Sequence, residues 1–138
     1  MLKANPYFGA LGRLLMAALF PISGLGKIAA PALTQGFIAS AGLPFPLLAY
    51  LVAILIEVGA GILLILGYQS RIVASVMAVF TVAAALSFHR NFADQNAMAH
   101  FLKNISITGG LLQIVTLGTG TFSIDGRLAS HARAMGRR

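Results

Sequence analysis

Residues 47–66 constrain the fold more than any other stretch of the sequence, because they are apolar throughout except for Glu57. Twenty helical residues rise about 30 Å, which matches the hydrocarbon thickness of a bilayer. The stretch therefore predicts a membrane-spanning helix with a carboxyl group close to its middle. An acid at that depth costs roughly 2.5–3.5 kcal/mol on insertion scales, so Glu57 is expected to have a cationic partner.

The composition supports an integral membrane protein of one domain. Of its 138 residues, 58% are hydrophobic and 9% are charged, whereas about a quarter of the residues of a soluble domain are charged. The chain has no cysteine, which excludes disulfides, thiol chemistry and cysteine-ligated metals. A redox role would need a borrowed cofactor. The net charge of +7 is assigned to topology and lipid headgroups, with no nucleic acid as partner.

The apolar runs predict an all-α membrane protein, an antiparallel bundle of four transmembrane helices in a single domain at residues 1–126. The connection between the first two spans contains three prolines and no charge, and its residues 34–43 predict a short interfacial helix. Residues 127–138 form a basic tail, expected to be a surface helix or disordered. A signal peptide is the alternative for the first run, and Arg13 inside that run argues against it. The predicted spans are about 7–27, 47–66, 72–89 and 104–123.

The distribution of cations predicts the orientation in a bacterial inner membrane. Four spans place both termini on one side, and seven cations fall on that side or in the inner half of a span, against three on the other. Positive residues are enriched on the cytoplasmic side, so both termini are expected in the cytoplasm. The seven are Lys3, Arg13, Arg71, Arg127, Arg133, Arg137 and Arg138, and the three are Lys27, Arg90 and Lys103.

Arg13 is the first-choice partner for Glu57. By residue count, Arg13 lies about 9 Å and Glu57 about 14 Å from the inner membrane edge, a gap that an arginine side chain covers. Arg13 and Lys27 are fourteen residues apart, which places both on one helix face. Lys27 would reach Glu57 only through a kink at Pro21, so it is assigned to a second cluster. A buried pair that only fixes helix packing is the alternative to a functional site.

A second polar cluster is predicted at the outer mouth of the bundle, around the loop between the third and fourth spans. Together with Lys27, it would suit an anionic or quinone-like group, and histidine could exchange protons near neutral pH. Long cations at span ends also commonly reach out to headgroups, which is the structural alternative. Two isolated histidines match no ligand spacing, so neither a metal nor a haem is expected. The cluster comprises His89, Arg90, Asp94, His100, Lys103 and Asn104, while Arg71 marks the inner end of the third span.

Four segments in a fixed order carry a family resemblance over roughly residues 12–125. They read RLLMAALFPISGLGKI, GLPFP, EVGAGILLILGYQSR and HFLKNISITGGLLQIVTLGTGTFSID, with a histidine closing the third span. This arrangement resembles the DoxX family of small bacterial inner-membrane proteins. The resemblance implies a four-helix inner-membrane bundle, and some relatives are linked to quinone-coupled thiosulfate oxidation or to membrane oxidoreductase complexes. Close relatives carry an HHxW-like segment after the third span, where this chain reads HRNF.

Three functions remain open at this stage. The first is an accessory or quinone-handling protein of a respiratory membrane system, in which Arg13, Lys27 and Glu57 line a polar cavity walled by Phe20 and Tyr50. The second is a small-solute or proton-coupled transporter using the same residues. The third is a non-catalytic scaffold subunit of a larger membrane complex, with the bilayer, other membrane proteins or further copies of itself as partners. The sequence assigns no catalytic residue.

Overall fold

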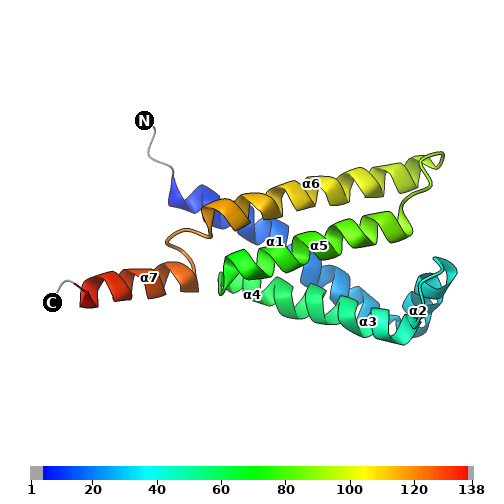
Figure 1. The fold of residues 1–138 in the computed structure, drawn as a ribbon, viewed down its shortest axis with the longest axis horizontal. Coiled ribbons are helices and arrows are strands. Elements are labelled where there is room, and N and C mark those ends of the chain that lie inside the picture. The colour runs from blue at the N-terminus through cyan, green and yellow to red at the C-terminus, as the bar shows by residue number, and fades with distance from the viewer. Residues whose placement is uncertain (1–4, 137–138) are drawn as a thin grey trace.

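The computed structural model describes residues 5–136, and within that range it contains helices and no strand. Lys3, Arg137 and Arg138, which were counted for the orientation, lie outside the described residues. The helices, labelled in Figure 1, are α1 (Pro6–Ala29), α2 (Pro31–Ser40), α3 (Pro46–Ile54), the π-helical segment η1 (Leu55–Ala60), α4 (Gly61–Leu66), α5 (Ser70–Phe88), α6 (Gln95–Leu117) and α7 (Ile124–Met135).

Four long rods form the body of the molecule. Helix α3, η1 and α4 follow one another without a break, and Figure 1 shows this rod running beside α5, with α6 on the other side of α5. The rod also packs against α1. The most extensive contacts join α5 to α6 and α1 to α4. We call the end with the α4–α5 turn and α7 the turn end, and the opposite end, with α2 and the α5–α6 loop, the α2 end. The N-terminal end of α1 also lies at the turn end.

Within residues 5–136, three helices are long and apolar enough to cross a bilayer, namely α1, the rod at Pro46–Leu66, and α5. They coincide with the stretches predicted as spans at 7–27, 47–66 and 72–89. The fourth prediction, 104–123, falls mainly on α6, which begins nine residues earlier and is not among the three. Its first half carries His100, Lys103 and Asn104, which lower its hydropathy, so the fourth span stays a prediction.

Prolines and polar caps fix where the helices begin. Pro31 and Pro46 occupy the first turns of α2 and α3, where proline costs no hydrogen bond. Helix α2 therefore starts three residues before the predicted 34–43, and its interfacial position stays a prediction.

Pro21 does not unwind α1, which is helical throughout. The irregular turn is η1, in the second rod. Helix α7 occupies most of the predicted tail.

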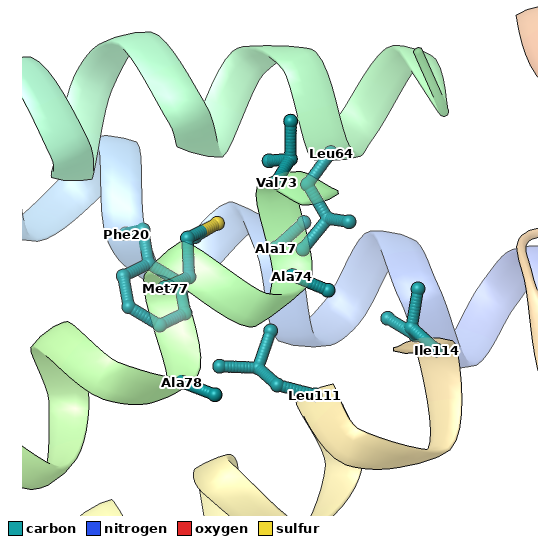
Figure 2. Packing of buried hydrophobic residues seen from close by; sticks show 9 residues of the cluster. All are labelled: Ala17, Phe20, Leu64, Val73, Ala74, Met77, Ala78, Leu111 and Ile114. Atoms are coloured by element: carbon teal, nitrogen blue, oxygen red, sulfur yellow. The ribbon is translucent and has the colours of Figure 1, made fainter. Parts of the chain in front are cut away.

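The apolar core is small and lies toward the turn end of the rods (Figure 2). Most large apolar side chains instead face outward, as expected of helices covered by lipid. The small residues Ser70, Ala74 and Ala78, each four positions apart, are buried on α5, consistent with close helix contact. The core comprises Ala17 and Phe20 of α1, Leu64 of α4, Val73, Ala74, Met77 and Ala78 of α5, and Leu111 and Ile114 of α6.

Candidate functional site

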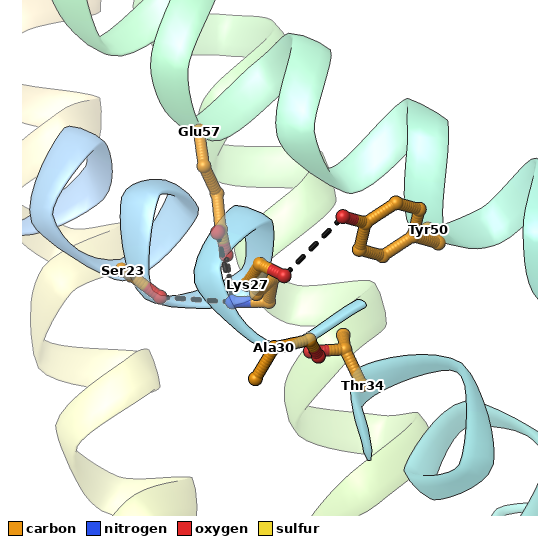
Figure 3. Close-up of polar contacts among 6 residues, drawn as sticks. All are labelled: Ser23, Lys27, Ala30, Thr34, Tyr50 and Glu57. Atoms are coloured by element: carbon orange, nitrogen blue, oxygen red, sulfur yellow. Dashed lines mark hydrogen bonds and ion pairs between the residues drawn. The ribbon is translucent and has the colours of Figure 1, made fainter. Parts of the chain in front are cut away.

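A buried ion pair joins the end of α1 to the middle of the second rod. Lys27 Nζ lies 2.9 Å from Glu57 Oε1 and 2.8 Å from Oε2, and it donates a third hydrogen bond of 2.9 Å to Ser23 Oγ (Figure 3). The Glu57 side chain is 9% exposed and that of Lys27 is 27% exposed. Lys27 thus satisfies both carboxylate oxygens of the acid that the sequence places inside a membrane helix.

Two glycines let the helices approach closely enough for this pair to form. A Cβ at Gly24 would lie 2.6 Å from Val58 Cγ2 and 3.1 Å from Glu57 Cβ, and one at Gly61 would lie 2.7 Å from Pro21 Cδ. The close approach therefore requires glycine on both helices. Glu57 faces Gly24, and Lys27 is about one turn further along α1, within reach of the carboxylate. Tyr50 Oη donates to the Lys27 carbonyl at 3.3 Å, which ties the end of α1 to α3.

The predicted pairing of Arg13 with Glu57 was wrong. Because Glu57 lies against Gly24, it is eleven residues, or about 16 Å along the helix, from Arg13. Arg13 is buried at the turn end, where Nη1 donates to the Thr119 carbonyl at 2.8 Å and Nη2 to the Phe122 carbonyl at 2.7 Å. The depth estimate failed because it treated the spans as starting at one level, whereas the glycine contacts set their axial offset.

The ion pair lies in the wall of a cavity of about 460 Å³ at the α2 end. The cavity is enclosed by residues of α1, α2, α3, η1, α5 and α6, and its lining is mostly apolar. Phe20 is part of the wall, as predicted, whereas Tyr50 is not. Helix α2 adds Thr34, Phe37 and Ile38, a contribution that the sequence analysis missed. The only signal for it was the apolar character of the connection between the prolines.

The predicted outer cluster is divided by the structure. His89, Lys103 and Asn104 line the cavity. Arg90 is exposed outside the cavity lining, and Asp94 caps α6 by accepting a hydrogen bond from Asn96 N at 3.0 Å. Three of the six residues predicted together, His89, Lys103 and Asn104, therefore lie at the cavity. Arg90 and Asp94 belong to the loop between α5 and α6.

His100 joins the cavity indirectly, through His89. The two imidazole rings stack with centroids 5.1 Å apart. His100 Nδ1 lies 3.0 Å from Lys103 Nζ, and because an ammonium group only donates, this nitrogen accepts the hydrogen bond. Burial lowers the pKa of His89, and the positive charge that His100 carries when it is protonated and the charge of Lys103 lower it further. His89 therefore carries its proton less readily than a free histidine.

This shift predicts acid sensitivity. Since the unfolded chain binds the His89 proton more readily than the folded chain, stability should fall as the pH drops through the ordinary histidine pKa near 6.5. We expect His89→Gln to show a smaller loss of thermal stability between about pH 7.5 and pH 5.5 than the unaltered chain. Melting in detergent across this range is the measurement. The matched control is His131→Gln on the exposed face of α7, and equal slopes for both variants would contradict the prediction.

A different polar cluster, at the turn end, surrounds the start of α5. The sequence analysis missed it. Asp125 Oδ1 accepts from Gln69 N at 2.9 Å, and Oδ2 accepts from Ser70 N at 2.8 Å and from Ser70 Oγ at 2.6 Å. Partial burial acts to raise the pKa of Asp125, but these hydrogen bonds and the charge of Arg13 outweigh it and hold the pKa below its usual value. No local sequence signal shows that this carboxylate caps a helix 55 residues away.

Comparison with known proteins places the chain in a known family. The DoxX family model matches residues 9–90, which include Arg13, Lys27, Glu57 and His89. The chain belongs to the DoxX family. The matched region ends before α6, so the Lys103 and Asn104 side of the cavity lies outside it.

Two curated relatives of this DoxX protein come from Escherichia coli strain K12. The inner membrane protein YqjF is 38% identical over 115 residues, covering 83% of this chain and 87% of the relative. The inner membrane protein YphA is 32% identical over 130 residues, covering 90% of this chain and 92% of the relative. No solved structure matches the chain significantly. Together with the apolar helices, these relatives support a bacterial inner-membrane protein.

The chemistry available at the site is binding and proton exchange. Among residues 5–136, no group of three or more histidine, cysteine, aspartate or glutamate side chains could hold a metal ion. The cavity offers two ammonium groups, a carboxylate, an imidazole and an amide within mostly apolar walls. A few polar groups in an otherwise apolar pocket are typical of sites for small amphiphilic molecules.

Proposed function

We propose that this DoxX protein is a quinone-handling accessory component of a respiratory or redox system of the inner membrane, with its site at the Lys27–Glu57 pair. The observation that carries the proposal is the position of this pair in the wall of a mostly apolar cavity at the α2 end. A quinone has the matching chemistry, since its ring carbonyls accept hydrogen bonds and its tail is apolar.

The hydrogen bonds of Lys27 leave room for such a ligand. Two of its three donors serve Glu57, and the third serves Ser23, a neutral hydroxyl that a quinone carbonyl can replace. The Asn104 amide, on the α6 side of the cavity, is a second potential donor. His89 at the same cavity can exchange protons with solvent when the bound ring changes its protonation state.

The proposal includes the topology. Helix α6 acts as the fourth span, the turn end faces the cytoplasm and the cavity faces the periplasm. The exposed arginines and lysine support this orientation. Arg71, Arg127 and Arg133 lie at the turn end, whereas Arg90 and Lys103 lie at the α2 end, and positive residues favour the cytoplasmic side.

The packed core favours a binding site over a transport path. Leu64, Met77 and Leu111 are fully buried, and they lie between the cavity and the turn end. A proton-coupled transporter would need a polar path through this layer. A cavity closed at its inner end supports binding from one side of the membrane.

Titration with decylubiquinone tests the proposal. The purified chain in neutral detergent should show saturable binding by calorimetry, and Asn104→Leu should weaken it about tenfold, the value of one good hydrogen bond to a buried polar partner. Arg127→Gln, on α7 at the opposite end, is the matched control and should bind as the unaltered chain does. Absence of saturable binding to the unaltered chain would contradict the quinone role and favour the scaffold alternative. Equal affinity in Asn104→Leu would contradict the position of the site.

A further inference from the structure

A second cavity, of about 540 Å³, lies at the turn end between the start of α5, the end of α6 and α7. We call it the anion cavity. It is separate from the cavity at the α2 end that holds the Lys27–Glu57 pair, and the two cavities share no lining residue. Its polar lining includes the side chains of Arg71, Thr121, Asp125, Ser130 and Arg133.

The ionisable groups of the anion cavity carry a net formal charge of +1, from two arginines and one aspartate. The oxygens of Asp125 already accept three hydrogen bonds from Gln69 and Ser70. Asp125 is therefore committed to capping α5. Neither arginine forms an ion pair with it among residues 5–136.

Both arginines have donors to spare. Arg71 makes one long hydrogen bond, 3.4 Å from Nη2 to the Thr116 carbonyl, and its guanidinium lies over Gly118, where a Cβ would be 3.8 Å from Nε. The Arg133 side chain makes no hydrogen bond within the described part of the chain. Two guanidinium groups thus line one concave surface with most of their donors free, whereas the Ser130 hydroxyl donates to the Arg127 carbonyl at 2.7 Å.

The apolar edge of the same cavity is continuous with the lipid-facing surface. Ile72 and Leu117 both line the anion cavity and are 65% and 76% exposed. Guanidinium groups bind phosphate with paired hydrogen bonds, and basic pockets beside membrane helices suit lipid headgroups. We propose that the anion cavity binds a phosphate group, carried by an anionic phospholipid or by a free phosphate compound, through Arg71 and Arg133.

Native mass spectrometry of the purified chain with added lipid tests this proposal. The unaltered chain should retain phosphatidylglycerol in preference to phosphatidylcholine, and Arg71→Gln combined with Arg133→Gln should weaken phosphatidylglycerol binding about tenfold or more. Both arginines are exposed, so the variant is expected to fold. Arg133→Gln alone, on a helix without buried residues, is the second variant and should show part of the loss.

Arg127→Gln is the matched control, because it removes the same charge from the same helix but does not line the cavity. Its phosphatidylglycerol binding should stay within about twofold of the unaltered chain. A separate arm adds millimolar inorganic phosphate: displacement of the lipid identifies a site for free phosphate compounds, and lipid retention identifies a headgroup site. Unchanged lipid binding in the double variant, or an equal loss in Arg127→Gln, would overturn the proposal.

Discussion

Lys27→Ala should lower the free energy of unfolding by about 3 kcal/mol or more, the usual cost of removing one partner of a buried ion pair. The variant leaves the Glu57 carboxylate in the middle of a membrane helix with none of the hydrogen bonds that Lys27 supplies. Glu57→Ala should lower the free energy of unfolding by less than Lys27→Ala does. The Lys27 side chain is already 27% exposed near the end of α1, so it can extend toward headgroups when its partner is absent. Titration with a denaturing detergent in mixed micelles measures both changes.

Two double-mutant cycles separate the correct partner from the rejected one. The losses from Lys27→Ala and Glu57→Ala should be non-additive, with a coupling of about 1–3 kcal/mol, because the groups are in direct contact. Arg13→Ala and Glu57→Ala should instead add to within about 0.5 kcal/mol, as expected of distant sites. Additive losses in the first cycle, or coupling in the second, would contradict the observed pairing.

The sequence predicted the long apolar helices well because an apolar run of bilayer length has few other uses. Residues 47–66 were assigned from length and hydropathy alone, and the rod at Pro46–Leu66 matches them. The need of Glu57 for a cation followed from the cost of its burial and is also confirmed. The identity of the cation was not predictable in the same way. It depends on the axial offset of two helices, which the contacts of Gly24 and Gly61 determine.

Contacts between distant segments account for the other differences. Helix α2 forms part of the cavity wall because the chain folds back after Ala30. The hydropathy pattern does not predict this change of chain direction. Asp125 caps α5 by accepting hydrogen bonds from Gln69 N and Ser70 N, residues far from it in the sequence. Local patterns predict which residues avoid lipid, whereas tertiary packing decides which of them meet.

Arg13→Ala should also cost about 3 kcal/mol or more. Its guanidinium donates to the carbonyls of Thr119 and Phe122, and each hydrogen bond from a charged group contributes about 1.5–3 kcal/mol. Without these donors, the segment between α6 and α7 loses its attachment to α1. Arg13→Lys should recover only part of the loss, because a single ammonium nitrogen does not reproduce the fork that joins two carbonyls.

The location of the damage distinguishes this variant from one at the ion pair. In Arg13→Ala, hydrogen exchange should accelerate at the amides of Asp125 and Gly126, which are bonded to the Gly67 carbonyl and to Ser123 Oγ. The cavity at the α2 end lies beyond the core layer of Leu64 and Leu111, so the affinity for decylubiquinone should change by less than about twofold. Faster exchange around Glu57, or a tenfold loss of ligand affinity, would instead show that Arg13 supports the ion-pair site and that the two polar clusters act as one.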